Sequence, residues 1–317
     1  MHSFLHSRHQ TTQSFAFFSF PMPPPIVVLV VGMAGSGKST LIQRLITSID
    51  DPQRHAYVVN LDPAVLGPLN YPAHVDIRQT VDYRKVMEEY TLGPNGAIIT
   101  CLNLFATRIH ELVHLIERRV EATDGALEFV IVDTPGQIEA FSWSASGEVI
   151  TEALRLGFPT VLLFVADGLR CVQSATTFMS NMLYACSMMF RARIPLLVAF
   201  NKSDTCDLSV LSTWMKDAFA FHDALQAGES RSGGVRPDTD GEYMLELTHS
   251  MSLLLDSFYE NLENVSVSAM SGDGVDDLFE KVRGLREEYD AMRKEWERQE
   301  SEKKEKEKER EKAILLP

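Results

Sequence analysis

The segment Gly32–Ser39 reads G-M-A-G-S-G-K-S, and it constrains the fold of this chain more than any other feature. It follows a continuous β-branched run at residues 26–31 and opens a stretch of helical periodicity from about residue 38 to residue 49. Glycines here let backbone N–H groups surround phosphate oxygens, and the following helix adds the positive end of its dipole. A strand, a glycine loop and a helix in this order predict a phosphate-binding loop.

The rest of the chain alternates between strand-like and helix-like segments. Short apolar runs predict strands at residues 55–60, 128–132, 160–165, 195–200 and 265–268, and helical periodicity occurs at 82–90, 97–119 and 175–190. The proline-rich segment 61–72 is expected to be a loop. This alternation predicts an α/β P-loop NTPase fold, a mainly parallel sheet with helices on both faces plus helical insertions. Ligands of such sheets bind at the carboxyl ends of the strands.

Three segments are distinguished along the chain. Residues 1–25 lack Asp and Glu and contain a proline cluster, so a disordered extension, or translation that starts at Met22, is expected there. Residues 26–285 form the predicted α/β domain, in which the polar, glycine-rich segment 228–241 is expected to be an exposed insertion. Residues 286–317 are almost wholly charged, which predicts a solvated helical or disordered tail.

Composition excludes several classes of function. The net charge of −14 argues against direct binding to the phosphate backbone of nucleic acids. Prolines interrupt the apolar run near the N-terminus, so no membrane span is expected there. The four cysteines, Cys101, Cys171, Cys186 and Cys206, are scattered without a C-x-x-C pair. We expect reduced core residues of an intracellular protein, not a disulfide framework or a zinc site.

Each residue of the phosphate-binding loop has an expected role. Backbone N–H groups that surround the phosphates come from Gly35, Ser36 and Gly37. The ammonium group of Lys38 is expected to reach the β- and γ-phosphates. The hydroxyl of Ser39 is expected to hold Mg²⁺, and Thr40 can reach an inner phosphate.

A second motif, V-D-T-P-G-Q, follows the strand at residues 128–132. The carboxylate of Asp133 closes that strand and is expected to face the Mg²⁺ shell, usually through water. Gly136 can offer its backbone amide to the γ-phosphate. An isolated D-x-x-G is weak evidence, but its position after a hydrophobic strand makes it a strong indication of a nucleotide-dependent switch segment.

A third motif, N-K-S-D, follows the strand at residues 195–200 and predicts recognition of guanine. The carboxylate of Asp204 accepts the two adjacent N–H donors on the guanine edge, whereas adenine leaves that carboxylate unpaired. Asn201 and Lys202 open the motif, and the aliphatic part of the Lys202 side chain can pack along the base. Ala269, after the last predicted strand, is placed to contact the guanine oxygen through its backbone.

The combined motifs resemble those of the GPN-loop GTPases. G-P-N stands at Gly93–Asn95, and the segments T-L-G-P-N-G-A-I-I-T-C-L-N-L-F and D-T-P-G-Q-I-E-A-F look like the type associated with assembly and nuclear delivery of RNA polymerase II. The match runs from about Ile26 to Arg283. The resemblance implies a Mg²⁺-dependent GTPase that hydrolyses GTP to GDP and acts as a homodimer or as a heterodimer with a paralogue. It also implies RNA polymerase II subunits or assembly factors as partners, and a cytoplasmic protein that shuttles to the nucleus.

The resemblance also assigns roles to individual residues. Asp62, in N-L-D-P-A, would orient the attacking water, and Met33 stands where a wider dimeric class carries a signature lysine. In place of that lysine, Asn95 of the GPN motif (Gly93, Pro94, Asn95) would donate its amide to the γ-phosphate of the partner subunit. Gln137 and Glu139 either position water or face solvent, and the residues alone favour neither role.

Three alternatives remain open from the sequence. The chain could be a metabolic kinase that uses the same loop, although no signature of an acceptor pocket is present. It could be an ATP-using dimer of the wider class, in which case ATP and GTP would compete equally. It could also be a scaffold that binds GTP with negligible turnover, against which Asp62, Lys38 and Asp133 argue.

Overall fold

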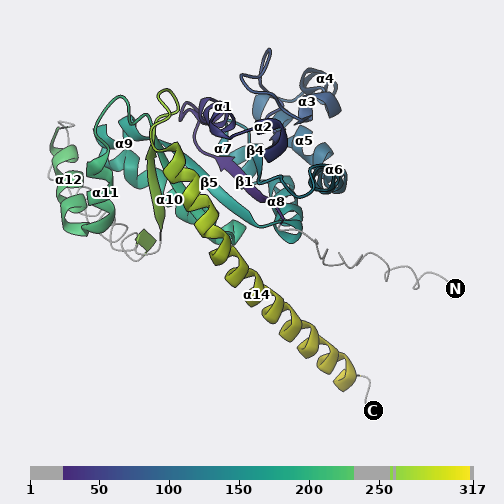
Figure 1. The fold of residues 1–317 in the computed structure, drawn as a ribbon. Helices are drawn as coiled ribbons and strands as arrows, with labels where there is room; N and C mark the ends of the chain where they lie inside the picture. Colours follow the sequence, from purple (N-terminus) through teal and green to yellow (C-terminus); the bar gives the residue numbers. More distant parts are fainter. Residues whose placement is uncertain (1–23, 232–257, 260–261, 315–317) are drawn as a thin grey trace.

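A seven-stranded parallel sheet forms the centre of the protein (Figure 1). The computed structural model describes residues 24–231, 258–259 and 262–314, and the strand order is β3-β2-β4-β1-β5-β6-β7. The strands are β1 (Ile26–Val31), β2 (Ala56–Asn60), β3 (Val75–Asp76), β4 (Phe129–Asp133), β5 (Thr160–Asp167), β6 (Leu196–Asn201) and β7 (Glu263–Val267). Every pairing between them is parallel, which confirms the predicted fold class.

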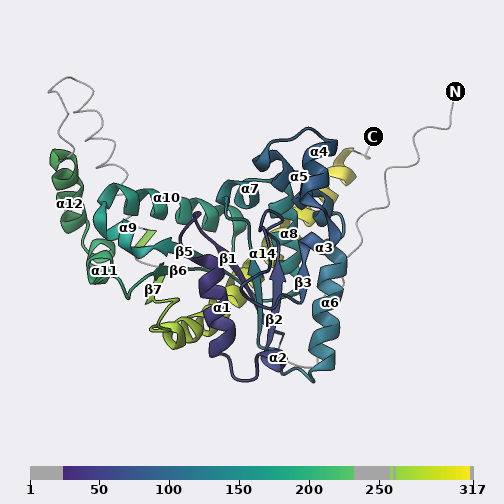
Figure 2. The same ribbon diagram turned by 90° about the horizontal axis from the view of Figure 1, so that it is seen from above.

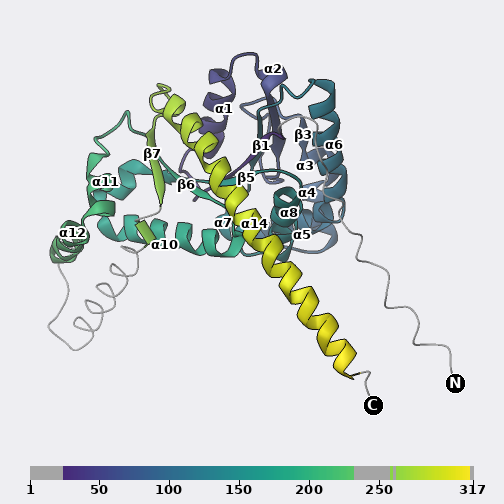
Figure 3. The same ribbon diagram turned by 60° about the horizontal axis from the view of Figure 1, so that its bottom comes forward.

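Helices cover both faces of this sheet (Figures 2 and 3). They are α1 (Lys38–Ser48), α2 (Pro52–His55), α3 (Ile77–Thr80), α4 (Tyr83–Glu89), α5 (Pro94–Ala106), α6 (Ile109–Ala122), α7 (Ile138–Ser142), α8 (Ala145–Gly157), α9 (Gly168–Gln173), α10 (Ala175–Ala192), α11 (Ser209–Lys216), α12 (Ala218–Arg231) and α14 (Val275–Ile314). Alternate residues of β1 point to opposite faces. Val28 and Val30 pack with α1 and the start of α14, whereas Val27 and Leu29 pack with α5, α6, α8 and α10.

The predicted long helix over residues 97–119 is wrong, because the structure has two helices there. Helix α5 ends at Ala106 and α6 begins at Ile109, and the Arg108 amide donates to the Phe105 carbonyl across the break. This short turn keeps apolar residues facing the sheet on both sides, so the apolar periodicity does not reveal it. Helix α5 also begins three residues earlier than predicted, since a proline at the first helical position, here Pro94, lacks an N–H that would be unpaired anyway.

Helix α14 continues through the predicted domain end at residue 285. Tyr289 is completely buried, and its hydroxyl donates to the carbonyl of Arg155 in α8. The guanidinium of Arg155 lies 4.4 Å from the ring centroid of Trp296. The packed part of α14 therefore extends beyond residue 285 to Trp296, and the helix then projects from the body of the protein (Figure 1).

Other expectations concern the chain ends, the cysteines and membrane spans. Residues 1–23 and most of the predicted insertion at 228–241 lie outside the described residues. All four cysteines are free, and Cys101, Cys171 and Cys186 are buried as expected, whereas Cys206 is only half-buried. Among the helices that the structure describes, none combines the length and the apolar character that crossing a membrane requires.

Candidate active site

The loop between β1 and α1 needs its glycines because neighbouring strand ends approach it closely. Gly32 has φ of 153°, and a Cβ there would lie 2.2 Å from the carbonyl oxygen of Val165 in β5. Gly37 has φ of 91°, and a Cβ there would lie 2.4 Å from Nδ2 of Asn201 at the end of β6. Both positions therefore exclude other residues for packing reasons, in addition to the predicted approach of phosphate.

Lys38 lies at the first turn of α1 with 6% of its surface exposed. Its Nζ donates to the carbonyl of Gly32 at 2.6 Å and to the carbonyl of Met33 at 3.3 Å. Burial lowers the pKa of Lys38, while the carboxylates of Asp133 and Asp62 raise it in part. The site thus holds a cation in a desolvated position at a helix N-terminus, which suits binding to a phosphate chain.

Ser39 and Asp133 meet as the metal prediction requires. The hydroxyl of Ser39 donates to Oδ2 of Asp133 at 3.3 Å, and Asp133 is 2% exposed. The other carboxylate oxygen, Oδ1, has no hydrogen-bond partner among the described residues. Burial raises the pKa of Asp133 to about 6, although hydrogen bonding from Tyr71 and the charge of Lys38 oppose that rise.

This donor set fits Mg²⁺. A buried, unpartnered carboxylate oxygen beside a hydroxyl provides hard oxygen ligands, which Mg²⁺ prefers. Within the described ranges, no group of three or more His, Cys, Asp and Glu side chains could hold a metal alone. Few protein ligands are what a magnesium ion needs when phosphates and water complete its shell. Ser39 and, through water, Asp133 would hold it.

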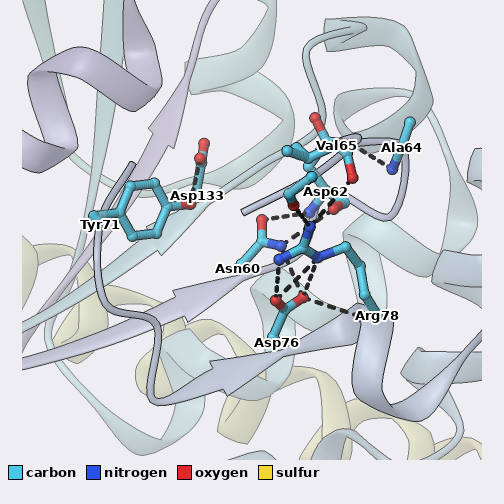
Figure 4. A network of polar contacts seen from close by, with 9 residues as sticks. Asn60, Asp62, Ala64, Val65, Tyr71, Asp76, Arg78 and Asp133 are labelled. Atoms are coloured by element: carbon cyan, nitrogen blue, oxygen red, sulfur yellow. Dashed lines mark hydrogen bonds and ion pairs between the residues drawn. The ribbon is translucent and has the colours of Figure 1, made fainter. Parts of the chain in front are cut away.

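Tyr71 is a site residue that the motifs did not indicate. Its hydroxyl donates to Oδ2 of Asp133 at 2.6 Å, and 4% of its surface is exposed (Figure 4). Burial raises the pKa of Tyr71, with the charge of Asp133 adding to the effect, so the hydroxyl remains a donor. Tyr71 lies in the predicted loop 61–72, and no local pattern connects it with a carboxylate 62 residues away.

Asp62 links the loop after β2 to the segment after β4. Its Oδ1 accepts from the amide of Ala64 at 2.9 Å, and its Oδ2 accepts from the amide of Gly136 at 3.2 Å. The amide of Gly136 is also the group that the sequence predicts for the γ-phosphate. A γ-phosphate and the carboxylate of Asp62 would therefore compete for one donor.

Asn201 joins the phosphate-binding loop to the predicted base-binding loop. Its Nδ2 donates to the carbonyl of Ser36 at 2.9 Å. Its Oδ1 accepts from the amides of Lys202 at 2.9 Å and Ala269 at 3.0 Å. One buried side chain therefore fixes three loops at the carboxyl end of the sheet.

The residues predicted to read the base have protein partners that the motif did not predict. Asp204 is exposed, and its Oδ1 accepts from the hydroxyl of Ser268 at 2.6 Å. Nζ of Lys202 lies 2.6 Å from Oδ2 of Asp167 and donates to the carbonyl of Gly35 at 3.2 Å. Asp167 ends β5 beside Asn201. The predicted strand stopped at residue 165; extending it by two residues would have placed this carboxylate at the ligand-binding edge.

Comparisons with known proteins find relatives over most of this chain. A family profile described as "Conserved hypothetical ATP binding protein" matches residues 30–288. GPN-loop GTPase 1 of Saccharomyces cerevisiae is 44% identical over 268 residues, which cover 84% of this chain and 68% of the yeast protein. This chain belongs to the GPN-loop GTPase family.

Two further relatives and one solved structure extend the comparison. The chain is 46% identical to GPN-loop GTPase 1 of Dictyostelium discoideum and 49% identical to GPN-loop GTPase QQT2 of Arabidopsis thaliana, over 84% and 82% of its own length. It spans 62% and 64% of the length of those two proteins. The apo form of a GTPase from Pyrococcus abyssi has the same fold, with a TM-score of 0.65, 23% identity, and coverage of 82% of this chain and 97% of that one.

The GPN motif of this family member opens α5. Gly93 caps the helix, and Pro94 and Asn95 form its first turn. All three residues are exposed, and the side chain of Asn95 makes no hydrogen bond within the part of the chain that the structure describes. The motif therefore lies on the surface, where a second chain can reach it.

The remaining predicted residues are not brought into the hydrogen-bonded site. Gln137 and Glu139 stand at the start of α7 with exposed side chains, for which the described residues provide no hydrogen-bond partner. The two roles considered for them therefore stay open. Thr40 is half-buried in the first turn of α1, behind Ser39.

Proposed function

We propose that this GPN-loop protein binds GTP together with Mg²⁺ and hydrolyses it to GDP and phosphate. The observation that carries the proposal is the position of Asn201, which bonds to Ser36 of the phosphate-binding loop and to Ala269 of the base-binding loop. A triphosphate and a purine would thus occupy one continuous edge of the sheet. The hydroxyl of Ser268 orients the carboxylate of Asp204 in that edge.

Guanine is the base that this edge suits. A carboxylate in the position of Asp204 accepts two adjacent N–H donors of guanine, whereas adenine offers no such pair and leaves the carboxylate without partners. The second candidate is an ATP-binding protein of the same fold, and the description of the matching family profile favours it. Displacement of a fluorescent GDP by unlabelled nucleotides decides between them. GTP should displace it at far lower concentration than ATP, and equal displacement would support the ATP-binding alternative.

Hydrolysis needs an oriented water and stabilisation of charge on the γ-phosphate. The γ-phosphate would accept from the amide of Gly136 and so release Oδ2 of Asp62, which then accepts a hydrogen bond from the attacking water. Lys38 neutralises charge on the phosphate chain. Mg²⁺ would supply further charge neutralisation at the phosphates when bound at Ser39 and Asp133.

A single-turnover assay of phosphate release tests this mechanism. The wild-type protein should release phosphate from GTP without an added acceptor, which also separates it from a kinase. Asp62→Ala should bind GTP and release phosphate far more slowly. Binding of GTP with no release by either protein would favour the alternative of a scaffold with negligible turnover.

We further propose a dimeric switch, in which Asn95 of one chain acts on the γ-phosphate held by another. The exposed position of Asn95 at the start of α5 supports this role. By family resemblance, the dimer is formed with a second copy or a paralogue and serves assembly and nuclear import of RNA polymerase II from the cytoplasm. Mass measurement in solution with GDP, and then with a non-hydrolysable GTP analogue, tests the dimer; a monomer under both conditions would contradict it.

A further inference from the structure

A network of three polar residues lies beneath the loop that carries Asp62 (Figure 4). It consists of Asn60, Asp76 and Arg78, which we call the anchor network. Asn60 ends β2, Asp76 ends β3, and Arg78 lies in the short helix α3. Asn60 is the first residue of the N-L-D-P-A segment, but the resemblance assigns a role there only to Asp62, and none of the three residues forms a hydrogen bond with the phosphate-binding loop within the described residues.

Asn60 holds the backbone of Asp62 from both sides. Its Oδ1 accepts from the amide of Asp62 at 3.0 Å, and its Nδ2 donates to the carbonyl of Asp62 at 3.2 Å. The same Nδ2 donates to Oδ1 of Asp76 at 2.9 Å. Asn60 is completely buried, so its amide has one orientation that satisfies these bonds.

Arg78 holds the same loop a few residues further along the chain. Its Nη1 donates to the carbonyls of Val65 at 3.2 Å and Gly67 at 2.7 Å. Its Nε and Nη2 donate to the carboxylate of Asp76 at 3.0 Å and 2.6 Å. A guanidinium presents five donors in a fixed plane, so it can bind a carboxylate with one edge while another donor reaches the loop.

The carboxylate of Asp76 connects the two contacts. It is 8% exposed, and although burial alone raises its pKa, the hydrogen bonds from Arg78 and Asn60 lower the pKa overall. Asp76 therefore stays charged and bonded to both partners at neutral pH. Leu66, between the two carbonyls that Arg78 binds, is 75% exposed and provides little packing to hold the loop. The start of this loop is held by burial of Leu61 and Pro63 as well as by Asn60, and the polar contacts of Arg78 are what fixes residues 65–67.

We propose that Asp76 and Arg78 are positioning residues, which hold the loop so that the carboxylate of Asp62 stays beside Gly136 and the γ-phosphate position. This inference rests on the proposed hydrolysis of GTP for its effect on rate. Displacement of a reacting group by about 1 Å can cost about 100-fold in rate. Loss of the contacts between Arg78, Asp76 and the loop should therefore slow hydrolysis, while the contacts with phosphate and base stay intact.

The test is single-turnover phosphate release by the full chain in Mg²⁺ and GTP, with the Kd of GTP measured in parallel. Arg78→Gln is expected to reduce the rate by about 10- to 100-fold and to change the Kd by less than about threefold. In an Asp62→Ala background the same substitution should change the rate by less than about twofold, because it acts through Asp62. An equal reduction in both backgrounds would overturn the proposal.

Matched variants separate positioning from general stability. Arg283→Gln removes a more exposed arginine–carboxylate contact, with Glu128 at 2.6 Å, at the far end of the sheet and should leave the rate unchanged. If Arg78→Gln does not fold, Asp76→Asn serves instead. This substitution retains the shape of the Asp76 side chain, and it should also slow phosphate release.

Hydrogen exchange gives a readout that does not need hydrolysis. In the protein without nucleotide, Arg78→Gln should speed amide exchange at residues 62–67 and leave exchange in the buried part of α14 unchanged. Unchanged exchange at 62–67 would overturn the positioning role. If the wild-type protein binds GTP without releasing phosphate, the proposed hydrolysis fails, and this measurement alone decides the role of Arg78.

Discussion

Replacement of Asp133 by asparagine is expected to stabilise the protein without nucleotide and to destroy its stabilisation by Mg²⁺ and nucleotide. Asp133 is 2% exposed, and its Oδ1 lacks a hydrogen-bond partner among the described residues. A charged carboxylate in that position is costly because burial removes its hydration. Asparagine keeps the shape, can still accept from the hydroxyl of Tyr71, and carries no charge.

The magnitude follows from the pKa of Asp133, which burial raises from the ordinary 3.8 to about 6. Each pKa unit corresponds to about 1.4 kcal/mol, so ionised Asp133 destabilises the folded protein by about 3 kcal/mol at neutral pH. The new amide group has no acceptor at the position of Oδ1, which costs about 1 kcal/mol or more. The expected gain in the free energy of unfolding is about 1–2 kcal/mol.

The pH dependence has a definite sign. Between about pH 4 and pH 6 the folded protein keeps a proton on Asp133 that the unfolded chain has lost, since the folded pKa is the higher one. The stability of the wild-type protein therefore falls as pH rises through that window, whereas the amide of the variant develops no charge. The advantage of Asp133→Asn should be complete above about pH 6 and should disappear below about pH 4.

Urea unfolding in EDTA, followed by tryptophan fluorescence, measures this difference at several pH values. The exposed Asp290 on α14 provides the control, and Asp290→Asn should change nothing. With Mg²⁺ and nucleotide at about 100 times Kd, the wild-type protein should gain about 2.7 kcal/mol, and Asp133→Asn should gain little. An Asp133→Asn protein that is less stable than wild type at pH 7 in EDTA would refute the reasoning.

Three further predictions concern single contacts of the site. Tyr71→Phe removes the 2.6 Å bond to Asp133 and should lower the free energy of unfolding at neutral pH by about 1.5–3 kcal/mol in urea titration. An unchanged free energy of unfolding would mean that this hydrogen bond does not offset burial of the Asp133 charge. Asp204→Asn should reduce the preference for GTP over ATP by about tenfold or more in displacement titrations, and an unchanged ratio would remove Asp204 from base recognition. Asn95→Ala should slow phosphate release more than it weakens GTP binding, whereas unchanged turnover would contradict its role on a partner chain.

Local patterns in the sequence were sufficient for most of the sheet and for the backbone of the site, but they did not predict the two-residue edge strand β3. The β-branched run 26–31 and the glycine loop after it specify a strand and a phosphate-binding loop, because both depend on residues close in the chain. The contact between Ser39 and Asp133 was predictable for a related reason. Parallel strands bring their carboxyl ends to one edge, so two motifs that each follow a strand must meet there.

Local patterns did not reveal two features of the fold, the break between α5 and α6 and the packing of α14 beyond the predicted domain end. The break between α5 and α6 leaves apolar residues on one face of both helices, so the sequence reads as one helix. The packing of α14 beyond residue 285 is hidden in a similar way, since Tyr289 and Trp296 stand among charged residues that suggest a solvated tail.

The sequence alone therefore determined six of the seven strands that the structure describes, and its motifs indicated a phosphate-binding loop and a base-binding loop. Tertiary structure alone decided that Tyr71 bonds to Asp133, that Asp167 pairs with Lys202 and that Arg78 holds the loop of Asp62. Tyr71, Asp167 and Arg78 come from segments that carry no motif. Their hydrogen bonds depend on distances of about 3 Å, which are set when the strands align and the loops between them fold back over the sheet edge.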